Sequence, residues 1–170
     1  MSRRRFEEAV MPHLNAAFNY ARWLTRNDAE AEDVVQEACL RALRFLSSLR
    51  EGDARPWLFA IVRNTWYSQA SRAANAAPAA PPVVDPADDT LDPEQRLLQR
   101  DTVARVRAAL EQLPIEFREV VLLREIEGLS YKDIAEAVHV PIGTVMSRLS
   151  RGRDRLLELL EADVRTEVLR

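Results

Sequence analysis

Three acidic side chains lie close together in the sequence, and carboxylates at such spacing can act as general acids and bases or hold a divalent cation. Glu30, Asp33 and Glu37 are three and four residues apart, so a helix over this segment places them near one face. The two histidines, His13 and His139, lie outside the segment and cannot complete a local ligand set. We therefore predict no catalytic site, metal site or cofactor here. Two interpretations stay open: a solvated acidic face, or a surface that docks a basic partner.

A second group of polar side chains has the chemistry of a nucleic-acid contact. The chain carries 24 basic and 27 acidic residues, a net charge of −3, yet residues 144–155 hold four arginines against Asp154, a local net charge of +3. A helix over residues 142–160 would place one set of side chains on a polar stripe: Thr144, Ser147, Arg148, Arg151 and Arg155. Hydroxyl and guanidinium groups suit phosphate oxygens and guanine edges. A small basic face on an acidic protein favours a DNA contact that depends on a partner.

The residues before this stripe predict a helix-turn-helix over residues 129–155. Ser130 and Asp133 match a capping box, and Leu129 and Ile134 match a hydrophobic staple, so a short helix should begin there. His139 stands where many such turns carry glycine, and histidine tolerates a positive φ better than most residues. The alternative is an ordinary helical hairpin with a solvated basic face.

Residues 55–72 mix aromatic and basic side chains around Asn64. Trp57, Phe59, Trp66 and Tyr67 are interleaved with arginines. Such a mixture can stack unpaired bases and hold a strand backbone. The same aromatics can equally form the core of a helical domain, and the residue types alone do not decide between the two.

The elements that must position these groups are helices, and we predict an all-α protein of two small domains. Residues 1–75 form three helices: about 6–26, with a possible break at Pro12, then 28–46 after an Asn27 cap, then 56–72. Residues 93–170 form four helices: about 93–112, 114–128, 130–138 and 142–160. Residues 76–92 are rich in proline, alanine and aspartate and are predicted to be a flexible linker.

Composition narrows the class of protein further. Only four glycines occur, which argues against a sheet-rich or phosphate-loop enzyme. The single cysteine, Cys39, excludes an internal disulfide and a Cys-based zinc site. No run of about 18 apolar residues is present, so we expect no membrane insertion. Without a secretory signal either, we expect a cytoplasmic protein.

Three stretches, in this order, resemble an extracytoplasmic-function (ECF) sigma factor of the sigma-70 superfamily. EDVVQEA at residues 32–38 resembles the helix that binds core polymerase, and RPWLFAIVRN at 55–64 resembles the promoter-melting helix. Residues 113–153 resemble the C-terminal promoter-binding domain. The resemblance covers nearly the whole chain and implies a bacterial transcription initiation subunit, not an enzyme.

The resemblance also implies a division of labour among named residues. Core RNA polymerase would be bound at the β′ clamp helices by Asp33, Gln36 and Glu37. The −10 element would be recognised as a single strand by Leu49, Arg50, Arg55 and Asn64, with Asn64 lining a pocket for a flipped base. The −35 duplex would be recognised by Thr144, Met146, Ser147, Arg148, Ser150 and Arg151. An anti-sigma factor is a further implied partner and would hold the two domains closed.

Departures from the family pattern limit what is expected of some positions. Met146 stands where the family often has a cation, so it can contact only an apolar base edge. Gly152 replaces a common alanine, at a cost of up to about 1 kcal/mol of helix preference. After Asn64 only Arg72 is basic before the linker, so contacts to upstream duplex should be weaker. Two further alternatives are a stand-alone helix-turn-helix regulator and an adaptor that acts only through protein contacts.

Overall fold

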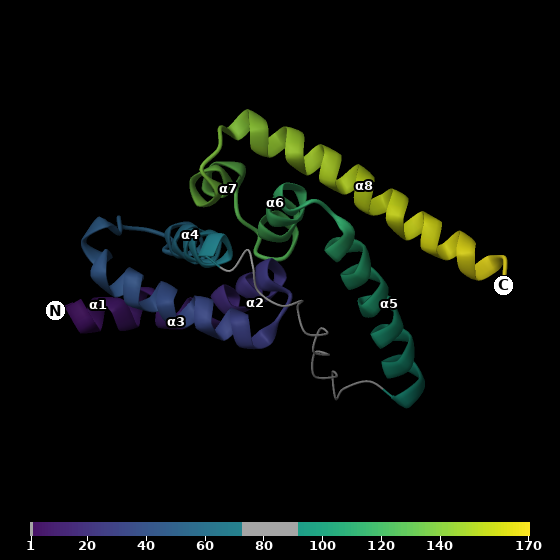
Figure 1. Cartoon of the computed structure of the whole chain (residues 1–170), viewed down its shortest axis with the longest axis horizontal. Helices are drawn as coiled ribbons and strands as arrows, with labels where there is room; N and C mark the ends of the chain where they lie inside the picture. The colour runs from purple at the N-terminus through teal and green to yellow at the C-terminus, as the bar shows by residue number, and fades with distance from the viewer. Residues whose placement is uncertain (1, 73–91) are drawn as a thin grey trace.

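The computed structural model describes residues 2–72 and 92–170, and within these ranges every regular element is a helix (Figure 1). The N-terminal bundle consists of α1 (Ser2–Ala9), the short 3-10 helix η1 (Met11–His13), α2 (Leu14–Thr25), α3 (Asp28–Arg44), η2 (Leu46–Ser48) and α4 (Arg55–Arg72). The C-terminal bundle consists of α5 (Pro93–Gln112), α6 (Ile115–Glu125), α7 (Tyr131–Val138) and α8 (Ile142–Val168). The all-α prediction is confirmed. Most of the predicted linker, residues 76–91, lies outside the described residues.

Local signals set the helix boundaries in the N-terminal bundle. Pro12 falls in η1, so the predicted first helix is divided into α1 and α2. Asn27 caps α3, its side-chain oxygen accepting a hydrogen bond from the Glu30 backbone N–H at 3.1 Å. The spacing of Ala31, Val35, Ala38, Ala42 and Phe45 predicts an apolar stripe on this helix, but Val34 is buried in place of Val35 and Phe45 is 52% exposed. Phe45 leaves the stripe because α3 ends at Arg44.

The segment between α3 and α4 is anchored by a small apolar cluster. Leu46, Leu49 and Ala54 are buried together, with Trp57 packed against them. The Trp57 indole N–H donates to the Ser48 hydroxyl at 3.1 Å, so this side chain has a structural role. Helix α4 then begins at Arg55, and Pro56 sits in its first turn as predicted.

Arg118 fixes the turn between α5 and α6. Its buried guanidinium donates to the backbone carbonyls of Leu110 at 2.9 Å, Glu111 at 2.7 Å and Leu113 at 3.0 Å. A fourth bond, to the carbonyl of Trp23 at 3.3 Å, crosses to α2. Arginine can satisfy this many acceptors because it carries five donors in a rigid fork.

Helix α8 extends well beyond the predicted end at about residue 160 and packs along α5 as well as α6 (Figure 1). Arg105 of α5 lies between Asp101, Asp163 and Glu167, which joins the last turns of α8 to α5. None of the helices of residues 2–72 and 92–170 has the length and apolar character needed to span a bilayer.

Gly152 is where α8 crosses α6 at close range. A Cβ atom at this position would lie 2.8 Å from Cγ2 of Val121 and 3.3 Å from Cβ of Phe117. The sequence predicts only a loss of helix preference at Gly152. The structure adds a packing role, because the Cβ atom of an alanine would overlap Val121 unless the side chain or the helices shifted. Gly143, the second residue of the same helix, faces open space.

We predict that Gly152→Ala lowers the free energy of unfolding by about 1–3 kcal/mol, as overpacking in a close helix contact does. Gly143→Ala is the matched control, and removing a flexible glycine there should be neutral or stabilise by up to about 1 kcal/mol. Chemical denaturation monitored by circular dichroism measures both. Equal effects of the two substitutions would contradict the close-crossing explanation.

Candidate nucleic-acid interface

The helix-turn-helix predicted from local signals is present. The Ser130 hydroxyl accepts a hydrogen bond from the Asp133 N–H at 3.1 Å, and Leu129 and Ile134 are both buried beneath this cap. His139 caps the end of α7 with a φ of 56°, in the left-handed region. This is the conformation expected at a turn position where glycine is common. Helical spacing predicts a shared core of Ile134, Val138, Val140, Val145 and Leu149. All of these are buried except Val140, which is half-buried.

The outer stripe of α8 presents the residues expected to contact duplex DNA. Met146, Ser147, Ser150 and Arg151 are exposed, whereas Thr144 and Arg148 are half-buried. Acidic residues outside residues 144–155 reduce the local charge of +3. Arg153 pairs with Glu125 at 2.6 Å and Arg155 with Glu158 at 3.1 Å. The basic character of the stripe therefore rests on Arg148 and Arg151.

The acidic face of α3 is exposed and carries apolar side chains that the sequence analysis missed. Asp33 and Gln36 are exposed, while Glu37 is half-buried and pairs with Arg41 at 3.1 Å. Leu40 is 64% exposed and Leu43 is 47% exposed, in register with Gln36 along the helix. Leu40 and Leu43 follow Gln36 by four and seven residues, and this helical spacing was the available signal. The face is a mixed acidic and apolar surface suited to a protein partner.

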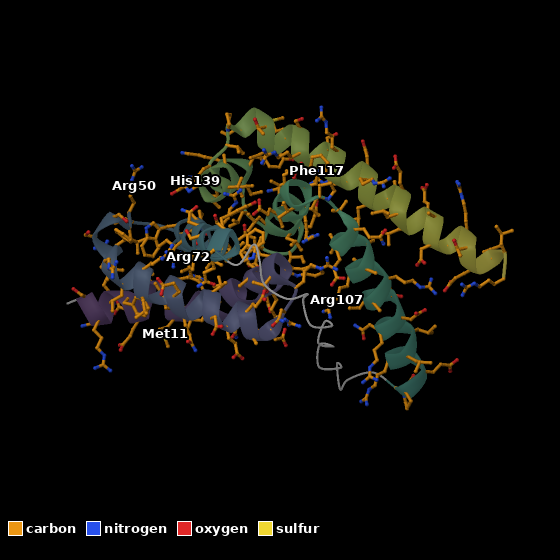
Figure 2. All side chains as sticks on the ribbon, viewed as in Figure 1. Met11, Arg50, Arg72, Arg107, Phe117 and His139 are labelled. Carbon is orange, nitrogen blue, oxygen red and sulfur yellow. The ribbon has the colours of Figure 1, made fainter. Side chains whose placement is uncertain are left out.

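The four residues expected at the −10 element lie in different environments. Leu49 is buried in the η2 cluster, and Arg50, labelled in Figure 2, is exposed on the loop that follows. Arg55 donates to Asp53 at 2.8 Å and to the backbone carbonyl of Glu127 at 2.9 Å. The Asn64 amide lies 3.4 Å from Nε2 of His139. Two of the four, Arg55 and Asn64, thus contact the C-terminal bundle.

An ion pair between the two bundles lies one residue before Asn64. Nε of Arg63 in α4 donates to Oε1 of Glu119 in α6 at 2.9 Å, and the Glu119 side chain is fully buried. Burial raises the pKa of Glu119 above its ordinary value, and the Arg63 charge opposes that rise. Burial, followed by the negative charge of Glu119, raises the pKa of Tyr20. No local sequence pattern predicts this pair, because its members are 56 residues apart.

The contact between the bundles is incomplete elsewhere. Helix α4 packs against α7, and Arg26 reaches Glu111 at 3.4 Å across the same boundary (Figure 1). Beside these contacts, a cleft of about 710 Å³ separates α2 from α5, with Asn19, Trp23 and Val106 among its lining residues.

Comparison with protein families gives two matches that follow the two bundles. Residues 9–76 match the model described as sigma-70 region 2, and residues 104–156 match the model described as sigma-70, region 4.

Individual relatives agree with these matches. An ECF RNA polymerase sigma factor, SigE, of Mycolicibacterium smegmatis is 36% identical over 158 residues, which is 91% of this chain but 61% of the relative. The RNA polymerase sigma-H factor of Pseudomonas aeruginosa is 31% identical over 170 residues, 94% of this chain and 88% of the relative.

Solved structures show the same similarity. The sigma factor RpoE of Bartonella quintana, crystallised with the anti-sigma factor NepR, has a TM-score of 0.73 at 30% identity, over 93% of this chain and 98% of that one. CnrH in complex with the cytosolic domain of CnrY has a TM-score of 0.67 at 26% identity, over 95% and 90% of the two chains.

The left-handed turn at His139 gives a stability prediction. His139→Gly should stabilise the fold by up to about 1 kcal/mol, because glycine adopts positive φ without a Cβ clash. His139→Val should destabilise it by about 1 kcal/mol or more, since a β-branched residue is strained there. Thermal unfolding of the two variants beside the natural chain measures the difference. If valine is tolerated as well as glycine, the turn does not impose this conformation.

Proposed function

The chain belongs to the ECF RNA polymerase sigma factors, and from this premise we propose that it directs core RNA polymerase to specific promoters and separates the strands of the −10 element. Sigma factors are regulatory proteins, so the catalysis of RNA synthesis comes from polymerase and this chain supplies promoter choice. The observation that carries the proposal is the presence of both promoter-contacting modules in one chain, each on its own bundle. The site of action is the cytoplasm, where polymerase and promoter meet.

Each segment has a distinct task in this proposal. Residues 1–75 bind core polymerase and the −10 strand, residues 76–92 connect, and residues 93–170 bind the −35 duplex. At the −35 element, α8 offers the exposed hydroxyls of Ser147 and Ser150 beside Arg151, with Arg148 next to them. Met146 is 53% exposed, which lets its side chain meet a thymine methyl group in the major groove.

The α3 face supplies the contact to the β′ clamp helices. Asp33, Gln36 and Glu37 provide charge complementarity to a basic partner, which speeds encounter and sets orientation. Leu40 and Leu43 provide the apolar area that such a contact needs at its centre. This face lies away from the boundary between the bundles, so it is available to polymerase while the bundles are still in contact (Figure 1).

The boundary between the bundles covers the face of α4 that would meet the −10 strand. Arg55, Arg63 and Asn64 all contact the C-terminal bundle. A DNA strand and the C-terminal bundle cannot occupy this face together, so the bundles must part before the −10 element is bound. Polymerase favours the open form by holding the two bundles at a set spacing along the promoter, which raises the effective concentration of each for its DNA element.

An anti-sigma factor is the partner that favours the closed form. Two structural neighbours that match over more than nine-tenths of this chain were solved as complexes, one with an anti-sigma factor and one with the cytosolic domain of CnrY. A protein that binds across both bundles stabilises them against each other only to the extent that it binds the closed form better than the open one.

Run-off transcription with purified core polymerase tests the function. Specific initiation is expected from the natural chain, and Arg148→Ala and Arg151→Ala should each weaken it by about tenfold or more, the loss of a base or phosphate contact costing about 1–3 kcal/mol. Arg165→Ala, on the exposed end of α8, is the matched control and should leave initiation unchanged. DNA binding with no effect on initiation would instead identify a stand-alone regulator. Activity that survives loss of both arginines would identify an adaptor.

Asn64→Ala should weaken the −10 contact and leave the −35 contact unchanged. Strand opening, measured by permanganate reactivity of unpaired thymines in the polymerase complex, should fall by about tenfold or more, because a flipped base loses its pocket at a cost of a few kcal/mol. Binding of a −35 duplex, measured by fluorescence anisotropy, should stay within twofold. Equal loss of both would show that Asn64 does not have the assigned role.

A further inference from the structure

The carboxylate of Glu119 lies against side chains of the N-terminal bundle, with Arg148 of α8 near enough to act on its charge. Its Oε1 accepts from Nε of Arg63 at 2.9 Å, and the Arg63 guanidinium lies 4.5 Å above the ring of Tyr67. The Tyr20 ring packs edge-on against Phe59 beneath this pair. We call Tyr20, Arg63 and Tyr67 the Arg63 site. Glu119 is its occupant and comes from the other bundle.

The fit between Glu119 and the Arg63 site is imperfect. Within the described residues, Oε2 of Glu119 and the hydroxyl of Tyr20 are buried and have no hydrogen-bond partner. A buried charge without a full set of partners costs free energy, and an ion pair in such a place is close to break-even. The site therefore holds an anion, and the Tyr20 hydroxyl lies near the carboxylate without a well-formed hydrogen bond to it.

A phosphodiester group matches the donors of the Arg63 site better than a carboxylate does. It presents two non-bridging oxygens to the arginine fork, and a tyrosine hydroxyl can donate to either of them. The neighbouring residues point to a DNA strand and not to an acidic peptide. Asn64, expected to hold a flipped base, is next in the chain, and Trp66 packs edge-on against Tyr67 with ring centroids 4.6 Å apart. Aromatic rings beside a cation are the usual platform for unpaired bases.

We propose that the Arg63 site binds a backbone phosphate of single-stranded DNA when the bundles part, and that Glu119 competes for the same site in the closed form. The proposal rests on the proposed function, since it assigns a contact to the strand that Asn64 would engage. It adds a phosphate site to α4, and it makes the C-terminal bundle a direct competitor of the DNA strand.

The test uses the full chain without polymerase or promoter and a fluorescent 15-nucleotide oligothymidine as the strand. Glu119→Gln removes the competing charge and keeps the side-chain shape, so affinity should rise by about tenfold, as expected for one charge-assisted contact. The slope of log affinity against log salt should steepen by about 0.7, as for one phosphate on a single strand. Glu161→Gln, on the exposed end of α8, removes the same charge and should give neither change.

Three further measurements test whether the gain in affinity for the strand comes from the Arg63 site. Combining Arg63→Ala with Glu119→Gln should return the affinity to that of the natural chain. A methylphosphonate oligothymidine, which has no backbone charge, should show no gain with Glu119→Gln. A glutamate-rich peptide with the same number of charges should bind Glu119→Gln much more weakly than the strand does.

Several results would overturn the proposal. Unchanged affinity in Glu119→Gln would show that Glu119 does not compete with DNA. A gain that survives loss of Arg63, or of the backbone charge, would place the strand elsewhere. Peptide binding as tight as that of the strand would make the site one for acidic protein segments. Because polymerase is absent, failure here leaves the run-off transcription result standing, and failure of run-off transcription does not alter these affinities.

Discussion

The contact between Arg63 and Glu119 is the interaction on which the arrangement of the two bundles depends. It is the buried, oppositely charged pair that crosses from α4 to α6, and it sits where the predicted promoter-melting helix meets the C-terminal bundle. A buried ion pair adds little net stability compared with an apolar contact, yet removing one partner is costly because the other charge stays buried. Such a pair fixes how the two bundles are oriented against each other but adds little to the free energy of their association. That balance suits the proposed function, in which the bundles are closed with one partner and open with another.

The neighbouring contacts follow the same pattern. The bonds from Arg55 to the Glu127 carbonyl and from Arg118 to the Trp23 carbonyl are polar and sit at the edges of the boundary. The cleft between α2 and α5 leaves part of the boundary unpacked. The buried apolar residues of the two bundles nevertheless form one continuous cluster, because α4 packs against α7. Separation of the bundles therefore exposes these polar groups together with apolar side chains at the boundary.

Much of the fold could be predicted because its determinants are local. Asn27 and Ser130 cap the helices that their spacing indicated, and His139 adopts the positive φ that its place in the turn required. The errors concern contacts between distant segments. The role of Gly152 depends on Val121, and the pairing of Arg153 depends on Glu125, which lies outside its own helix. The site residues on exposed helix faces could be named from the sequence, but not which of them the C-terminal bundle covers.

Helix α8 joins the two ends of the C-terminal bundle in one rigid element. At 27 residues it is about 40 Å long. Its first three turns carry the residues proposed to enter the major groove, its middle packs against α6 at Gly152, and its last turns pair with α5 through Arg105. One continuous helix therefore connects the proposed DNA-contacting turns to both neighbouring helices. Under the proposed function, the packing of α8 against α5 and α6 sets the angle at which its N-terminal turns meet the DNA.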